Sequence, residues 1–263
     1  MKNHPTKFGI ISIIIIQAVV FIHTTILLGD SDKKIKRSNS AYLENSSNII
    51  AIDIGHSKIN AGAISSRGIG EYYFNLILGK RLLHDLFEKG YTKSFIINPQ
   101  GDDISLKNRV NIANNKNANL FISIHHDSVQ PKYLKLWQFG NQSNHYCDLF
   151  SGYSIFYSTK NISSKKSLLF ANALGYELNK NKFVPTLHHS EKIDGESREL
   201  VNKSLGIYRV DDLGVIKSSK MPAIILECGV IVNRNEELLL SNPVYQEKIS
   251  TAVVRSIDGF FRK

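Results

Sequence analysis

Four side chains capable of hydrolytic chemistry lie where an apolar segment of the chain gives way to a loop. His56 follows the apolar run 49–53, His125 follows 120–124, Glu227 follows 223–226, and Glu71 opens a stretch with helical apolar spacing. A catalytic zinc site takes three nitrogen or oxygen ligands from the protein and leaves one position open, while a separate carboxylate moves the proton. His56, Glu71, His125 and Glu227 therefore meet the needs of a zinc hydrolase, with one carboxylate to spare.

Each of these residues also has a simpler interpretation when it is taken alone. A histidine after a glycine, such as His56, is usually a loop or core residue, and Glu71 is also favoured in a first helical turn by the helix dipole. The polar run His125-His126-Asp127 after an apolar strand is costly unless its members have partners. Glu227 lies in a strongly apolar segment, so its carboxylate must be paired, protonated or directed into a site. A buried ion pair with Lys or Arg is the alternative for Glu227.

From residue 49 onward, short apolar strands alternate with segments of helical spacing. This pattern predicts an α/β fold, in which a mostly parallel twisted sheet carries helices on both faces of a single catalytic domain. Strands are expected over 49–53, 94–98, 120–124, 152–158 and 223–228, and helices over 71–89, 105–117, 164–178 and 242–261. In such sheets ligands gather at the carboxyl ends of the strands, where His56, His125 and Glu227 fall.

The N-terminal sequence predicts export. Lys2 and Lys7 precede the apolar run 8–28, which contains no Lys, Arg, Asp or Glu. This order is typical of a secretory signal, and the run is also long enough to span a bilayer, so residues 1–29 are either a signal peptide or a signal anchor. Residues 30–48 are polar and form a predicted linker, which leaves 49–263 as the catalytic domain.

The bulk composition limits the classes of partner. The 263 residues are 42% hydrophobic and carry a formal net charge of +10, which favours anionic polymers such as nucleic acid, membrane surfaces or cell-wall glycans. No nucleic-acid-binding motif is present, so we expect no nucleic-acid partner. Two cysteines do not make a disulfide framework. Cys228 is expected to be a small buried hydrophobe, and a bridge to Cys147 is left open.

With these motifs in order, the chain resembles the zinc-dependent N-acetylmuramoyl-L-alanine amidases of the Amidase_3 family over residues 49–261. The resemblance rests on the motif 53–57, on Gly62-Ala63 and Gly70-Glu71, on Asp102, Asp103, Leu106, Arg109 and Ala113-Asn114, on the motif 120–125, and on the motif 222–229 with Asn233. It implies a mostly parallel sheet between helices, His56, Glu71 and His125 as zinc ligands, and Glu227 as the catalytic carboxylate. The implied substrate is peptidoglycan, cut between N-acetylmuramic acid and L-alanine, and the implied location is periplasmic, with anchoring to the inner membrane through residues 8–28 as the alternative.

The chain departs from the family pattern at three places. Ile54 stands where the family prefers proline, and Ser57 stands where glycine is frequent, but neither removes a ligand. His126-Asp127 follows His125 where the family usually has a small residue and then asparagine. Two adjacent histidines are therefore candidates for one ligand position, and His125 is the one in register.

The third departure is the long polar insert 185–209. Some family members carry a helix in this region that covers the zinc until a protein activator withdraws it. We expect 185–209 to be either such a lid or a surface helix that borders the cleft. The residues assigned here to substrate contact or regulation are His126, Asp127, Arg109, His188, His189 and Glu196.

Two other functions compete with the amidase. One is a different zinc peptidase or deacylase that acts on peptidoglycan peptides, because residue chemistry alone indicates only amide or ester hydrolysis. The other is a non-catalytic cell-wall-binding regulator with a degenerate site, against which the presence of all four site residues argues.

Overall fold

The computed structural model describes residues 45–262, which belong to one compact unit. The predicted signal at 1–29 and the linker residues 30–44 lie outside the described residues. Asn45 is buried, and its side-chain amide donates a hydrogen bond to the carbonyl of Lys89 at 2.7 Å. The compact unit therefore begins inside the predicted linker. Within residues 45–262, none of the helices combines the length and the apolar character needed to span a membrane.

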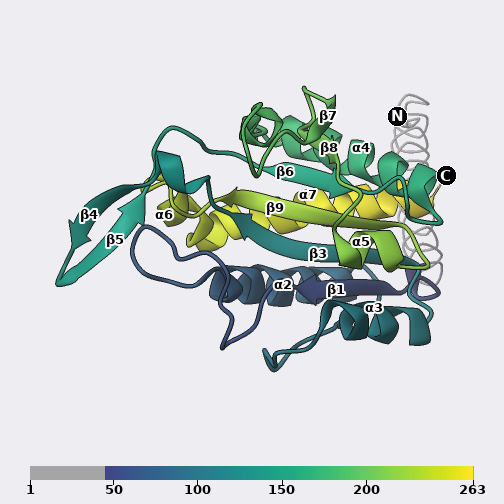
Figure 1. Cartoon of the computed structure of the whole chain (residues 1–263). Coiled ribbons are helices and arrows are strands. Elements are labelled where there is room, and N and C mark those ends of the chain that lie inside the picture. The colour runs from purple at the N-terminus through teal and green to yellow at the C-terminus, as the bar shows by residue number, and fades with distance from the viewer. Residues whose placement is uncertain (1–44, 263) are drawn as a thin grey trace, which may run out of the picture. The chain divides into compact units, whose positions relative to one another are not determined.

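Strands and helices alternate along the compact unit (Figure 1). The strands are β1 (Ile50–Ile54), β2 (Phe95–Ile96), β3 (Leu120–Asp127), β4 (Lys135–Phe139), β5 (Gln142–Tyr146), β6 (Ser154–Tyr157), β7 (Glu199–Asn202), β8 (Ile207–Arg209) and β9 (Ala223–Val230). The helices are α2 (Glu71–Glu88), α3 (Leu106–Asn115), α4 (Ser164–Lys180), α5 (Gly214–Ser218), α6 (Glu236–Leu240) and α7 (Pro243–Phe261), with short 3₁₀ turns at Pro131–Tyr133 and His188–Ser190.

Seven strands form one mixed sheet in the order β2-β1-β3-β9-β6-β8-β7, and β4 pairs with β5 in a separate hairpin. The pairs β1–β2, β1–β3, β3–β9 and β6–β8 are parallel, whereas β6–β9 and β7–β8 are antiparallel. The predicted mostly parallel sheet is confirmed, and its central strands β1, β3 and β9 all run in the same direction.

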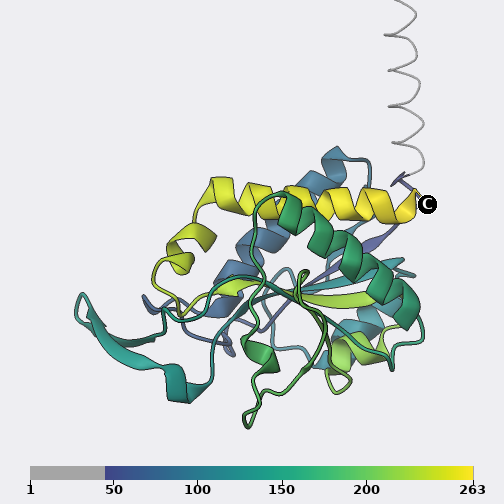
Figure 2. The same cartoon turned by 90° about the horizontal axis from the view of Figure 1, so that it is seen from above.

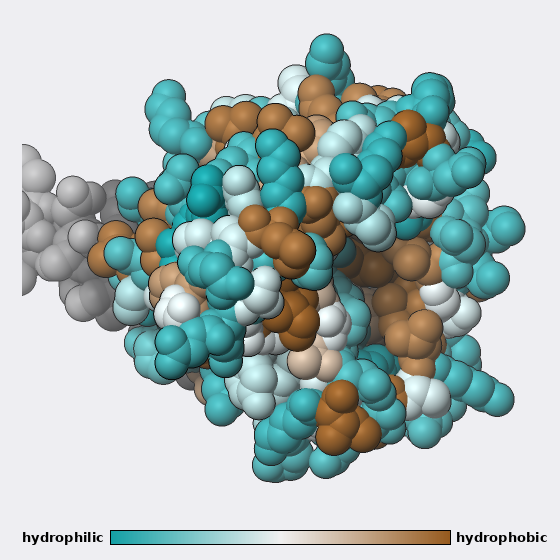
Figure 3. All heavy atoms as spheres, turned by 60° about the vertical axis from the view of Figure 1, so that its left-hand side comes forward, coloured by the Kyte–Doolittle hydropathy of each residue, from teal (hydrophilic) through white to brown (hydrophobic). Residues whose placement is uncertain are grey.

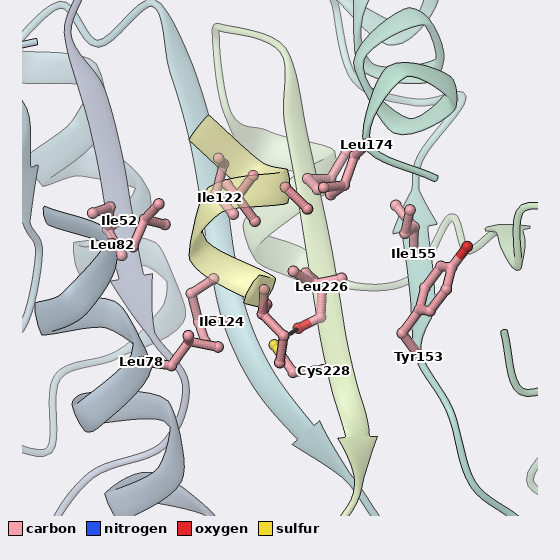
Figure 4. Packing of buried hydrophobic residues seen from close by; sticks show 14 of the residues in the cluster. Ile52, Leu78, Leu82, Ile122, Ile124, Tyr153, Ile155, Leu174, Leu226 and Cys228 are labelled. Carbon is pink, nitrogen blue, oxygen red and sulfur yellow. Dashed lines mark hydrogen bonds between the residues drawn. The ribbon is translucent and has the colours of Figure 1, made fainter. Parts of the chain in front are cut away.

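Both faces of the sheet are covered by helices, as expected for strands that are apolar throughout. One face packs α2, α4 and α7 against alternate residues such as Ile52, Ile122 and Leu226. The other face packs α3 and α5 against Phe121 and Ile225. Figure 2 shows these two helical layers on opposite sides of the sheet, and Figure 4 shows the first of the two cores from close by. Successive strand residues point to opposite faces, so each apolar strand contributes to both cores.

The sequence predictions hold for the long elements and weaken for the short ones. The helices expected over 71–89, 105–117, 164–178 and 242–261 are present as α2, α3, α4 and α7. The strand expected over 94–98 is reduced to the two residues of β2, because the chain bends at Ile97 and enters a turn at Pro99. The β4–β5 hairpin was not predicted, although its two-residue turn Gly140-Asn141 is a hairpin signal.

The expectation of a helix over 185–209 is wrong. This segment contains only the 3₁₀ turn His188–Ser190 and then the strands β7 and β8, which extend the edge of the main sheet. The apolar residues Ile207 and Tyr208 of β8 are buried and bind the segment into the core. The second half of this segment is therefore part of the sheet, and residues 185–209 contain no helical lid.

Both cysteines are buried and free. Cys228 packs in the core below β9, as expected for a small hydrophobe, and Cys147 packs with Val230 and Val232 in a separate small cluster. The Cys147–Cys228 bridge that the sequence left open is absent from the structure.

The carboxyl ends of the parallel strands β1, β3 and β9 lie side by side, so distant segments of the chain meet there. Ile54 lies opposite Ile124 in the β1–β3 pair, and His125 lies opposite Glu227 in the β3–β9 pair. Figure 3 brings this end of the molecule forward and shows a hollowed surface with hydrophobic residues on its wall.

Candidate active site

Three of the four residues singled out by the sequence lie close together at the carboxyl ends of these strands. His56 Nε2 lies 2.9 Å from one carboxylate oxygen of Glu71, and His125 Nδ1 lies 2.9 Å from the other. One donor atom from each residue lies within 4.8 Å of the others, a spacing that suits a shared metal ion. The residues come from the loop after β1, the first turn of α2 and the end of β3.

The Glu71 carboxylate is buried and surrounded by donors. Besides the two imidazoles, it accepts hydrogen bonds from the backbone N–H groups of Ala63 and His126, both at 3.2 Å, and from the amide of Asn75 at 3.1 Å. Burial alone would raise the pKa of Glu71, but hydrogen bonds from His125 and His56 outweigh it and hold the pKa well below its usual range. The same contacts raise the pKa of His125 to about 9 against the opposing effect of burial. The carboxylate is thus held ionised, which is the state that binds a cation.

His56 reaches the site through an unusual backbone conformation. Its φ of 67° lies in the left-handed region, which non-glycine residues seldom adopt and which is frequent at functional sites. The preceding Gly55 is not among the glycines with a positive φ. A Cβ at Gly55 would lie 2.4 Å from the ring of His125, so glycine is needed there because the imidazole packs directly on the backbone.

Arg109 fixes the loop that carries His56. Its buried guanidinium donates to Asp53 at 2.8 Å, to the carbonyl of Ile54 at 2.5 Å and to the carbonyl of His56 at 2.6 Å. Asp53 is in turn bound by the hydroxyl of Ser123 at 2.7 Å. These contacts occupy the Arg109 side chain, so its place in the structure is that of a positioning residue behind His56.

The structure separates the two adjacent histidines of β3. His126 turns away from Glu71 and contacts the side-chain oxygen of Asn75 through Nδ1 at 2.7 Å, next to the ring of Phe74. Burial lowers the pKa of His126 to about 3, so this ring is neutral. His125, and not His126, belongs to the group that could hold a metal.

Glu227 carries the feature that the sequence marked as anomalous. It lies opposite His125 on β9, and its buried Oε2 has no hydrogen-bond partner among the described residues. Within residues 45–262, no Lys or Arg forms an ion pair with it, so the alternative of a buried salt bridge is not what the structure shows. Burial, reinforced by the charge of Asp127, raises the pKa of Glu227 to about 8.

A second cluster lies on the other side of Glu227. Asp127, His188 and His189 gather their donor atoms within 4.8 Å of one another, and Glu196 contacts His189. The sequence grouped these residues only as candidates for substrate contact or regulation.

Sequence reasoning missed Asn75. This buried side chain donates to Glu71 at 3.1 Å and to the carbonyl of Gly55 at 3.2 Å, and its oxygen faces His126. Asn75 therefore links helix α2 to the ends of β1 and β3. Its position four residues after Glu71, on the same helix face, was the available signal.

The donor set fits zinc better than a harder cation. Two imidazoles and one carboxylate suit zinc, whereas Mg²⁺ and Ca²⁺ favour sites built from oxygen ligands alone. Glu71 is held by backbone and amide donors, as expected for a ligating carboxylate oriented by its surroundings. Glu227, which lies opposite His125 on β9 and has an unpartnered Oε2, adds a carboxylate of the kind that metal-assisted hydrolysis requires.

Comparison with known proteins finds similarity to one family of amidases. The family described as N-acetylmuramoyl-L-alanine amidase, Amidase_3, matches residues 50–259. The amidase AmiA of Escherichia coli K12 is 25% identical over 244 residues, which cover 89% of this chain and 81% of AmiA.

Solved amidase structures share the fold. The amidase AmiC2 of Nostoc punctiforme superposes with a TM-score of 0.61 at 24% identity, covering 82% of this chain and 98% of that one. Ami1 of Mycobacterium smegmatis gives a TM-score of 0.63 at 20% identity, covering 82% and 97% of the two chains. At these identities the structural likeness concerns the architecture of the sheet and its helices.

The role of Arg109 can be separated from substrate contact by a stability measurement. Arg109→Met leaves Asp53 buried without its partner, and breaking a buried ion pair in this way costs about 3–5 kcal/mol. We therefore expect a large fall in the free energy of unfolding, measured by denaturant titration. Arg255→Met on the exposed face of α7 is the matched control and should change stability by less than about 0.5 kcal/mol. Equal stability of the two variants would show that Arg109 does not position the His56 loop.

Proposed function

The chain belongs to the N-acetylmuramoyl-L-alanine amidase family and is an enzyme of that class, and we propose that it uses zinc to hydrolyse peptidoglycan. The bond cut joins the lactyl group of N-acetylmuramic acid to the L-alanine of the stem peptide. The family match over residues 50–259 supports the substrate, and the cluster of His56, Glu71 and His125 supports the metal. The formal net charge of +10 suits an anionic wall polymer.

The observation that carries the proposal is the free oxygen of Glu227 beside the three ligands. A buried carboxyl oxygen without a hydrogen-bond partner is unfavourable for folding, and such groups are concentrated at functional sites. A regulator that only binds cell wall would have no use for it. The rival peptidase has the same chemistry, so only its product distinguishes it from an amidase.

In the proposed reaction, His56, Glu71 and His125 hold the metal, and Glu227 handles the proton. Bound zinc supplies Lewis acidity at the scissile carbonyl and makes water a better nucleophile. Glu227 takes the proton of the attacking water as the carbon–oxygen bond forms, then delivers it to the amine nitrogen as the carbon–nitrogen bond breaks. The products are a lactyl carboxylate and a free N-terminal L-alanine. Arg109 and Asn75 act indirectly, because they orient His56 and Glu71.

We place the enzyme outside the cytoplasmic membrane, in the periplasm. The predicted signal in residues 1–29 and the location of peptidoglycan support this proposal. Anchoring through 8–28 stays a prediction, since that segment lies outside the described residues. The helix that an activator would withdraw is absent from residues 185–209, so we do not carry the predicted activator forward.

The proposed reaction is tested by its products. Purified full-length chain incubated with peptidoglycan should release peptides with a free N-terminal L-alanine, identified by mass spectrometry. A chelator should abolish the release, and added Zn²⁺ should restore it, because the metal is needed at the carbonyl. Cleavage between amino acids of the stem would identify a peptidase instead.

Ligands and proton carrier should respond differently to substitution. His56→Ala, Glu71→Ala and His125→Ala each remove a donor, so each should lower zinc content and activity together. Glu227→Gln should keep the zinc held by His56, Glu71 and His125. It should lower turnover by at least about 10²-fold, because this substitution removes only the proton transfer. The matched control is His126→Ala, which should retain zinc. Loss of zinc in His126→Ala with full zinc in His125→Ala would reverse our assignment.

Export is tested by a reporter fusion. A reporter that is active only in the cytoplasm, fused after residue 48, should be silent, whereas one active only after export should give signal. The control fusion lacks residues 1–29 and should show the opposite pattern. A strong cytoplasmic signal from the first fusion would refute the proposed location.

A further inference from the structure

A second cluster of metal-ligating side chains lies beyond Glu227 and takes no part in the reaction described above. Asp127 ends β3, and His188 and His189 form the 3₁₀ turn after α4. Nε2 of His189 lies 2.8 Å from Oδ2 of Asp127, and Nε2 of His188 lies 3.3 Å from the same oxygen. Donor atoms that share one tetrahedral zinc ion stand roughly 3.3 Å apart. The three atoms are thus already near the spacing that a common ion requires.

The opposite nitrogens of both rings are held by outer partners. Nδ1 of His189 contacts Glu196 at 3.0 Å, and Glu196 is itself bound by the amide of Gln130 at 3.1 Å. Nδ1 of His188 contacts the hydroxyl of Thr186 at 2.7 Å. A histidine that ligates a metal nearly always donates its other ring N–H to such an oxygen, which fixes the tautomer and aims the free nitrogen at the ion. Both rings therefore have the arrangement of metal ligands.

One nitrogen of this cluster makes only a long contact. His188 is 3% exposed, and its Nε2 lies 3.3 Å from Oδ2 of Asp127 without a hydrogen bond among the described residues. When Nδ1 carries the proton and donates to Thr186, Nε2 presents a lone pair to a carboxylate, which is unfavourable in a buried place. A cation between the two groups removes this conflict.

The surroundings also favour a divalent ion. The two imidazoles lie with ring centroids 4.0 Å apart, close enough for both rings to face one ion. Asp127 and Glu196 together supply the two negative charges that balance such an ion. The rings of Phe150 and Phe156 pack against the two histidines at 5.1 Å and 5.0 Å and shield the site from water.

We propose that Asp127, His188 and His189 form a second metal site, selective for zinc and similar divalent ions and distinct from the site of His56, Glu71 and His125. Two imidazoles and a carboxylate are ligands of this class of metal. Asp127 and His125 stand two residues apart on β3, so one strand carries a ligand of each site, and Glu227 lies opposite His125 on the neighbouring strand. The proposal rests on the second cluster alone and does not depend on the amidase chemistry.

Metal stoichiometry tests the second site. Full-length chain equilibrated with Zn²⁺ and freed of excess should contain two zinc ions per chain by mass spectrometric metal analysis. His188→Ala and His189→Ala should each reduce the content to one, His56→Ala should also reduce it to one, and the combination of His56→Ala with His189→Ala should leave none. The matched control is His145→Ala on the exposed strand β5, which should retain both ions.

A more conservative variant tests the second site with less risk that the chain fails to fold. Glu196→Gln keeps the size of the side chain and should weaken one of the two zinc affinities by about 10–100-fold in competition with a chromophoric chelator, since it only loosens the orientation of His189. Unchanged zinc content in His188→Ala and His189→Ala, together with unchanged affinities in Glu196→Gln, would overturn the second site. A single zinc that His189→Ala removes and His56→Ala retains would instead support the second site and refute the ligands proposed for the amidase.

Discussion

The burial of the Glu71 carboxylate is the constraint on which the site depends. A carboxylate removed from water is very unfavourable unless donors surround it, and the donors here come from four separate segments: His56 after β1, Ala63 in the following loop, Asn75 in α2, and residues 125–126 of β3. Satisfying one charged group therefore requires that the first loop, the first long helix and the central strand assemble together. The same requirement places two imidazoles next to one carboxylate, a donor set of the kind that binds zinc. The Glu71 side chain thus holds these segments together and also forms part of the candidate metal site.

The sequence was informative where one residue type has few physical explanations. Apolar strands that alternate with helices have few solutions other than a covered parallel sheet, and Glu227 in an apolar strand had to face a site or an ion pair. The sequence did not predict contacts between residues that are distant in the chain. Asp127 and His188 are about sixty residues apart, and no periodicity predicts that the chain returns through β6 and α4 and places them side by side. The insert 185–209 looked like a surface helix because it is polar, yet Ile207 and Tyr208 are buried in a two-strand extension of the sheet.

Strand β3 shows how three successive residues can serve three environments. The strand ends at an irregularity in its pairing with β9, between His125 and Asp127. His125 enters the first cluster, His126 enters the core beside Asn75 and Phe74, and Asp127 enters the second cluster. Alternation along a strand directs residues i and i+2 to one face and i+1 to the other, which separates His126 from His125 and Asp127. Irregularities in strand pairing are frequent next to active sites, where they can redirect a side chain toward the site.

Glu227 lies where the fields of both clusters meet. Its carboxyl group interacts with Asp127 and His189 on one side and with His125 and Glu71 on the other. An isolated carboxylate in this position would be driven to hold its proton by burial, and cations on either side favour the ionised form. Because a general base must be ionised before water attacks, the charge state of each cluster bears directly on the group that transfers the proton. The two clusters are therefore coupled electrostatically through Glu227, even though no hydrogen bond to its Oε2 joins them within the part of the chain that the structure describes.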